Sequence, residues 1–239
     1  MKKFIFLVVC VLLSCSSKTS FQKKLEVLKV INLTVPESSG ITVYNNSLYI
    51  VSDQNGTIYK TSLEGKISKK FKTKFSDLEG ITFNTIYHNF WIANEEGREL
   101  VVIDSIGNFI KKIKIKGEQE NNNSGLEGIC FVESEKLMYA INEKSPTQLL
   151  QVNLIGEILN KFTLDFSKDI SGICFDKNSD SFWTVSDESQ SVININKKGV
   201  LISSYKIPVK KAEGIVIYNN NLYVVSDSES KLYVFKMPD

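Results

Sequence analysis

The stretch SSGITVYNNSLYIVSD, residues 38–53, determines the architecture, because four close copies of it follow along the chain. Each copy has Ser or Glu before a Gly-Ile pair, then a hairpin, then a strand that ends in Ser-Asp or Asn-Glu. The copies are LEGITFNTIYHNFWIANE (78–95), LEGICFVESEKLMYAINE (126–143), ISGICFDKNSDSFWTVSD (170–187) and AEGIVIYNNNLYVVSD (212–227). Short strands repeating at this interval, 40 to 48 residues, indicate a β-propeller with one four-stranded blade per repeat.

A second series of glycines keeps step with the first. In the first repeat we expect strands at residues 40–44, 48–52, 57–62 and 66–74, with tight turns at Asn45-Asn46 and at Gly65. The Gly65 position returns in the next three repeats as Gly107, Gly156 and Gly199. The fifth repeat ends after its third strand, while residues 25–35 form an unpaired strand-like segment before the first repeat. We therefore predict an all-β, five-bladed β-propeller over residues 24–239, closed by the N-terminal strand, which completes the last blade.

The N-terminus resembles that of an exported protein. Lys2 and Lys3 precede a run of ten apolar residues, 4–13, which is too short to span a bilayer. The segment Leu12-Leu13-Ser14-Cys15 resembles a bacterial lipobox, which implies cleavage before Cys15 and a diacylglyceryl group on that cysteine. We expect residues 1–14 to be a signal peptide, and residues 15–23 to be the lipidated cysteine and its tether. The alternative is an ordinary secretory signal with an incidental cysteine.

Charge and cysteine content limit the partners. Removal of residues 1–14 takes two lysines from 29 basic residues and leaves 27, equal to the 27 acidic residues. No basic excess remains to drive nucleic-acid binding, and we expect a monomer. Cys130 and Cys174 occupy the same repeat position, which favours buried thiols over a disulfide. An aromatic residue recurs in the second strand of each repeat, where packing between blades is favoured over a ligand-stacking surface. These residues are Tyr49, Trp91, Tyr139, Trp183 and Tyr223.

Two acidic series should meet on one face of the propeller, because the first strand of each repeat leaves that face and the second returns to it. The inner series, directly before Gly-Ile, contains Glu79, Glu127 and Glu213, with Ser39 and Ser171 in the other two repeats. Because the first strand is innermost, these glutamates should converge on the channel mouth, where they repel one another unless protonated or bridged by a cation. Oxygen-rich clusters suit Ca²⁺, so we predict the three glutamates as metal ligands.

The outer series ends the second strand of each repeat, and we predict it as outer support for binding. Its members are Asp53, Glu95, Glu143, Asp187 and Asp227. The competing interpretation is structural, since such side chains also satisfy backbone donors in the following turn.

Few residues suggest catalysis. The single histidine, His88, falls in a hairpin on the opposite face from the acids, which argues against a His-rich zinc site and a Ser-His-acid triad. The sequence carries no phosphate-binding glycine-rich loop. We therefore name no catalytic residue and favour a protein without enzymatic activity.

The runs SSGITVYNNSLYIVSD, DLEGITF, SGLEGICF and AEGIVIYNNNLYVVSD resemble the SdiA-regulated, or YjiK-like, β-propeller family, which includes calcium-regulated CarP-like propellers. The similarity covers about residues 30–237. It implies a propeller in the bacterial cell envelope, often membrane-anchored, and a link to calcium. It supplies no catalytic residue.

Two main functions remain open. The first is a membrane-anchored lipoprotein facing the periplasm, whose acidic face binds Ca²⁺, or a protein or small-molecule partner. The second is a Ca²⁺-dependent phosphoesterase, in which the same carboxylates hold an ion that polarises a phosphoryl oxygen. A scaffold with partners on the blade edges is a third possibility.

Overall fold

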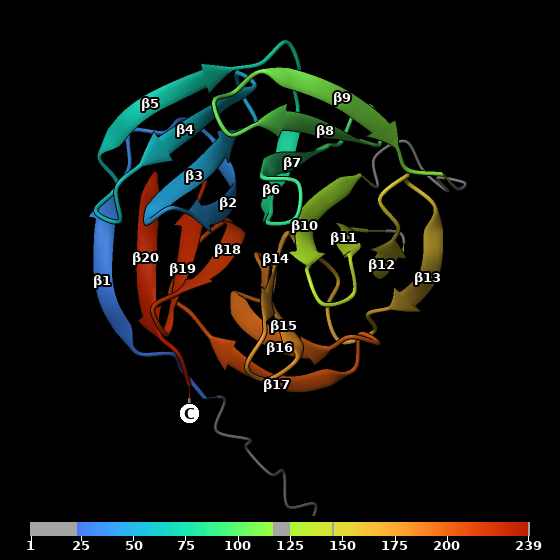
Figure 1. The fold of residues 1–239 in the computed structure, drawn as a ribbon. Helices are drawn as coiled ribbons and strands as arrows, with labels where there is room; N and C mark the ends of the chain where they lie inside the picture. The colour runs from blue at the N-terminus through green and yellow to red at the C-terminus, as the bar shows by residue number, and fades with distance from the viewer. Residues whose placement is uncertain (1–22, 117–124, 145, 239) are drawn as a thin grey trace, which may run out of the picture.

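Five four-stranded antiparallel sheets stand around a central axis in the computed structural model, which describes residues 23–116, 125–144 and 146–238 (Figure 1). The predicted five-bladed propeller is confirmed. The predicted signal peptide and Cys15 lie outside the described residues. Within the described ranges, no helix has the length and apolar character needed to cross a membrane.

Each blade follows the strand order of its repeat, from the axis outward. Blade 1 contains β2 (Ser38–Tyr44), β3 (Ser47–Ser52), β4 (Thr57–Thr61) and β5 (Ile67–Lys72). Blade 2 contains β6 (Leu78–Asn84), β7 (Asn89–Asn94), β8 (Glu99–Asp104) and β9 (Phe109–Lys114). Blade 3 contains β10 (Leu126–Val132), β11 (Leu137–Asn142), β12 (Gln148–Val152) and β13 (Ile158–Thr163). Blade 4 contains β14 (Gly172–Asp176), β15 (Ser181–Ser186), β16 (Ser191–Asn196) and β17 (Leu201–Lys206).

Blade 5 joins the two ends of the chain, as predicted. It contains β18 (Ala212–Tyr218), β19 (Asn221–Ser226) and β20 (Lys231–Lys236), with β1 (Val27–Asn32) as the outermost strand. β1 lies beside β20 (Figure 1) and pairs with it in the antiparallel direction. In this register Val30 is opposite Tyr233. The hydrogen bonds of this pair close the ring without an extra strand at the C-terminus.

The innermost strands of neighbouring blades touch around the whole ring, β2 against β6, β6 against β10, and onward to β18 against β2. A glycine permits this approach in each blade, because a Cβ there would strike the backbone of the next blade. At Gly128, for example, a Cβ would lie 2.7 Å from the Ser171 carbonyl oxygen and 2.8 Å from the Ile173 nitrogen. The contact between each Gly-Ile glycine and the backbone of the next inner strand therefore sets the spacing of the blades.

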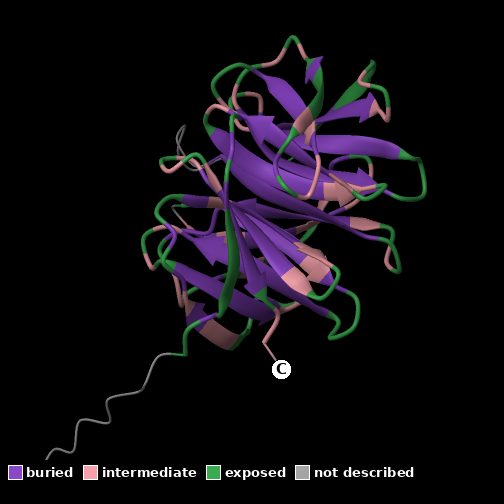
Figure 2. Ribbon diagram, turned by 90° about the vertical axis from the view of Figure 1, so that its left-hand side faces the viewer, coloured by how far each residue is buried: buried purple, intermediate pink, exposed green. Residues whose placement is uncertain are grey.

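The core fills the wedges between blades, and exposed positions concentrate in the turns and the outer strands (Figure 2). The five recurrent aromatic side chains of the second strands are at most 7% exposed and belong to these core clusters, as the packing interpretation predicts. Cys130 and Cys174 are buried free thiols, which confirms the preference over a disulfide.

Candidate functional site

The three inner glutamates line one cavity of about 140 Å³ at one end of the axis. Glu79 is the second residue of the inner strand of blade 2, and Glu127 and Glu213 hold the same position in blades 3 and 5. The cavity also holds six further side chains with polar groups: Glu37, Ser38, Ser39, Asp53, Glu143 and Asp227, together with the single cationic side chain of its lining, Lys211. The convergence of distant carboxyl groups on one cavity is the geometry expected from rotational repetition.

The outer acids divide into two groups. Asp53, Glu143 and Asp227 line the cavity, whereas Glu95 and Asp187 are outside its lining. Asp187 Oδ1 accepts a hydrogen bond of 2.7 Å from the backbone N–H of Lys211, so it ties blade 4 to blade 5. This contact is structural, but its donor lies in the loop before β18 and not in the turn after β15, where the alternative interpretation placed it.

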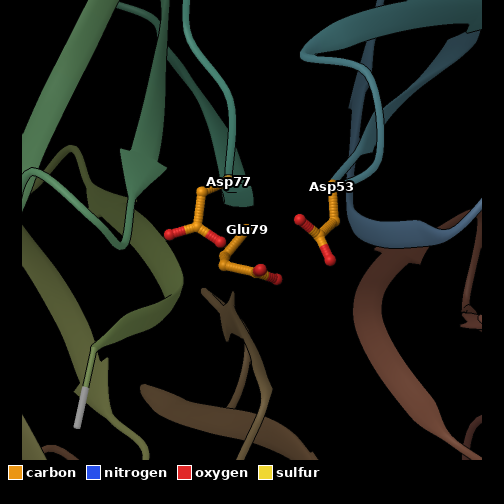
Figure 3. A group of neighbouring side chains, drawn as sticks. All are labelled: Asp53, Asp77 and Glu79. Carbon is orange, nitrogen blue, oxygen red and sulfur yellow. The ribbon is translucent and has the colours of Figure 1, made fainter. Parts of the chain in front are cut away.

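A carboxylate missed in the sequence, Asp77, completes the tightest group of oxygen atoms. Among the described residues, Asp53, Asp77 and Glu79 each offer a carboxylate oxygen within 4.8 Å of the other two, and they face one another across the gap between blades 1 and 2 (Figure 3). Glu127 and Glu213 line the cavity but are not part of this group. An ion at the trio would use Glu79 alone of the three predicted inner ligands.

The backbone holds Asp77 in place. Its φ angle is +57°, and its Oδ2 accepts a hydrogen bond of 2.6 Å from the Glu96 N–H. The residue stands two before Glu79, and the equivalent position in the other repeats also favours polar residues. The full series is Glu37, Asp77, Gly125, Asp169 and Lys211. Alignment of the repeats one position further toward the N-terminus would have exposed this third series.

Each serine of the inner series donates a hydrogen bond to a glutamate of the next blade. The Ser39 hydroxyl of blade 1 donates a hydrogen bond to Glu79 Oε2 of blade 2. In the same way, a hydrogen bond from Ser171 of blade 4 stabilises the carboxylate of Glu213 in blade 5. Glu127 follows Glu79 rather than a serine around the ring, so two carboxyl groups are neighbours there.

Burial raises the pKa values of the three inner glutamates, the ring carboxyls, and so disfavours their ionised forms. Desolvation raises the pKa of Glu79 to about 8, against the opposing effect of the Ser39 hydrogen bond, and raises the pKa of Glu213 to about 7. Burial, followed by repulsion from Glu79, raises the pKa of Glu127 well above its ordinary value. At neutral pH the ring therefore retains protons that a bound cation would displace.

We expect the Ser171→Ala substitution to raise the pKa of Glu213 further, because the buried carboxylate loses its serine donor. The free energy of unfolding at pH 8 should fall by about 1 kcal/mol, the usual net contribution of such a hydrogen bond. A carbon-detected NMR titration of Glu213 in the variant and the parent protein measures the pKa. An unchanged pKa would contradict the role assigned to the serine.

The cavity ends at the ring of glycines. Between the inner strands the axis leaves only about 10 Å³ of free space, at Gly40, Gly80, Gly128, Gly172 and Gly214, which is room for about one water molecule. The acidic cavity is therefore a blind depression, separate from the opposite end of the propeller. His88 lies at that opposite end, in the β6–β7 hairpin, where it cannot act with the acids.

Comparison with known proteins agrees with this architecture. A family model described as SdiA-regulated matches residues 15–163 and 156–239. Glutaminyl cyclase from Myxococcus xanthus is similar in structure, with a TM-score of 0.71, 10% identity, and coverage of 91% of this chain and 100% of that chain. Virginiamycin B lyase from Staphylococcus aureus has a TM-score of 0.57, 14% identity, and coverage of 88% and 99%. A nidogen–laminin complex includes a chain with a TM-score of 0.59, 15% identity, and coverage of 84% and 80%. At these identities the likeness extends to the fold alone.

Proposed function

The chain belongs to the SdiA-regulated family, and we propose that it is a non-catalytic binding module whose acidic cavity takes a divalent cation, with Ca²⁺ as the preferred ion. The observation that carries this proposal is the trio of Asp53, Asp77 and Glu79, whose oxygen atoms lie within 4.8 Å of one another. Carboxylate oxygens are the ligands that Ca²⁺ prefers.

Other members of the cavity can complete the coordination. Ca²⁺ takes about six to eight oxygen ligands, more than three carboxylates in single contact supply. Glu127 and Glu213 line the same cavity and carry raised pKa values, so a cation that draws a proton from either would gain an anionic ligand. Asp227 and Glu143 line the same cavity, and we propose them as outer support for the ion.

The N-terminal sequence supports a location in the bacterial cell envelope. A lipid on Cys15 would anchor the chain to a membrane, and residues 16–22 would join it to the first described residue, Lys23. We propose a periplasm-facing lipoprotein, in which the ligand of the acidic face is the cation itself or a protein that binds through it. Double acylation is sufficient for stable membrane attachment.

Electrostatics favour binding over phosphoester hydrolysis. Seven carboxyl groups and one lysine line the cavity, so an unassisted phosphate would meet strong repulsion. In a Ca²⁺-dependent phosphoesterase at this cavity, the bound ion and Lys211 would have to offset that repulsion.

A thermal melt with and without Ca²⁺ tests the proposal. At a free Ca²⁺ concentration about a hundred times the dissociation constant, binding should stabilise the folded state by about 2.7 kcal/mol. For a chain of this size the melting temperature should rise by about 5–10 °C. The rise should be lost in the Glu79→Gln, Glu127→Gln double variant and in Asp77→Asn.

The matched control is Glu188→Gln, which removes one carboxylate from an exposed turn on the same face but outside the cavity lining. This variant should keep the full Ca²⁺ effect. An equal loss in the control would assign the effect to general charge screening. If the protein hydrolyses phosphomonoesters or phosphodiesters and this activity depends on Ca²⁺ and Glu79, the proposal of a non-catalytic module is wrong and the protein is a phosphoesterase.

A further inference from the structure

A second, larger cavity opens at the opposite end of the axis, and its lining is mostly apolar. Its volume is about 570 Å³, within the range of about 300–1,000 Å³ that is typical of small-molecule sites. All five inner strands contribute to it with the three residues that follow each ring glycine. The deepest ring is isoleucine in every blade: Ile41, Ile81, Ile129, Ile173 and Ile215.

The walls above the isoleucine ring are also poor in polar groups. The next positions are Thr42, Thr82, Cys130, Cys174 and Val216, and the outermost positions are Val43, Phe83, Phe131, Phe175 and Ile217. The Thr82 hydroxyl already accepts a hydrogen bond of 3.2 Å from the Phe131 N–H. Burial raises the pKa of the Cys130 thiol to about 12, so that group stays neutral. Water in such a cavity finds few partners and is displaced favourably by an apolar group.

The mouth of this cavity carries no excess charge. Its two charged lining residues are Glu133 and Lys177, one of each sign. On the surrounding hairpins, Lys197 pairs with Glu135 at 2.8 Å and with Asp180 at 2.7 Å. An anionic or cationic ligand would therefore gain no net attraction here, in contrast to the acidic cavity.

We propose that this cavity, the isoleucine pocket, binds a neutral, predominantly apolar small molecule of drug-like size. Three observations carry the assignment: the volume, the apolar wall from all five blades, and the balanced mouth. The pocket is blind, because the glycine ring leaves about 10 Å³ between it and the acidic cavity. It is therefore a separate site, and its occupancy does not depend on the cation.

Titration with the neutral fluorophore N-phenyl-1-naphthylamine tests the proposal. We expect saturable, one-to-one binding with a blue-shifted, enhanced emission, and binding weaker by about tenfold or more for the anionic 8-anilinonaphthalene-1-sulfonate. Ca²⁺ and EDTA should leave the affinity for the neutral probe unchanged. If the protein binds Ca²⁺ but not the neutral probe, only the proposal for this cavity is overturned. If it binds the probe but not Ca²⁺, only the cation site is overturned.

Two filling substitutions locate the probe. Thr42→Phe on β2 and Val216→Phe on β18 each place a larger side chain on the pocket wall, and each should weaken binding by about tenfold or more. Ile202→Phe, on the exposed outer strand β17, is the matched control and should leave binding unchanged. Thermal melts establish that each variant is folded, and the two filled positions lie on different blades, so one unstable variant leaves the other as the test. Unchanged affinity in a folded filling variant, or an equal loss in the control, would contradict the assignment.

Discussion

Replacement of Gly128 by alanine should destabilise the propeller by about 3 kcal/mol, near the upper end of the usual overpacking cost. The new Cβ would lie 2.7 Å from the Ser171 carbonyl oxygen, 2.8 Å from the Ile173 nitrogen and 2.9 Å from the Gly172 Cα. All three atoms belong to the backbone of the next inner strand, so no side chain can rotate away. The ring can accommodate the methyl group only if blades 3 and 4 separate.

Thermal and urea denaturation measure this effect, and for a chain of this size the melting temperature should fall by about 6–12 °C. Gly97→Ala is the matched control, because its Cβ would meet side-chain atoms of Asn94 and Glu99 rather than a neighbouring blade. The control should cost clearly less. Equal losses in the two variants would show that the glycine ring does not set the spacing of the blades.

The second large effect is a loss of stability as the pH rises in the absence of divalent cations. The pKa of Glu79 is about 8 in the folded protein against 4.5 as a free side chain, and that of Glu213 is about 7. The folded state therefore holds protons more tightly than the unfolded state, and the stability that these protons supply is complete below about pH 4.5. It falls progressively above pH 4.5, with a limiting slope of about 1.4 kcal/mol per pH unit for each carboxyl, and is fully lost once the pH has passed about 7 for Glu213 and about 8 for Glu79.

The acidic groups that face these carboxyls also raise their pKa values. Asp53, Glu95 and Glu213 repel the charge on Glu79, while Glu143 adds to the repulsion on Glu127. Lys211 opposes the shift at Glu213 without cancelling it. Denaturation in EDTA at several pH values between about 4.5 and 9 should record the fall, and Ca²⁺ should reduce it.

A single substitution isolates the contribution of the ring. Glu127→Gln resembles the protonated carboxyl, so this variant should be more stable than the parent protein at pH 8 in EDTA, and its stability should change less with pH. Glu188→Gln, at an exposed position on the same face, should follow the parent curve. A variant less stable than the parent at pH 8 would contradict the burial of an ionised group at position 127.

Most of the fold could be predicted from the repeat, because the same close backbone contact between inner strands recurs in all five blades. The Gly-Ile pairs and the second glycine series together predict the blade number, the strand order and the closure by the N-terminal strand. The structure explains the regularity: a Cβ at Gly40 or Gly128 would strike the backbone of the next blade. This steric requirement accounts for the glycine at the same position of every repeat, which the sequence shows directly.

The site was predicted less completely, because its details depend on contacts between blades. Repetition placed Glu79, Glu127 and Glu213 on one cavity, but the partner of each is set by its neighbour around the ring, as Ser39 is for Glu79. Asp77 lies in the loop before β6, one residue before the compared repeat begins, so a comparison confined to the repeat did not include it. The volume of the isoleucine pocket depends on how far the inner strands diverge on that side of the glycine ring. No local sequence pattern predicts that separation.

Isothermal titration calorimetry with Ca²⁺ at pH 7.5, in two buffers that differ in ionisation enthalpy, tests the cation site most directly. We predict saturable binding accompanied by proton release, because the ring carboxyls that retain protons near neutral pH must ionise to become ligands. Asp77→Asn should weaken the binding, and Glu127→Gln should reduce the number of protons released. An absence of binding heat up to millimolar Ca²⁺ in both buffers, from protein that is folded, would contradict the account.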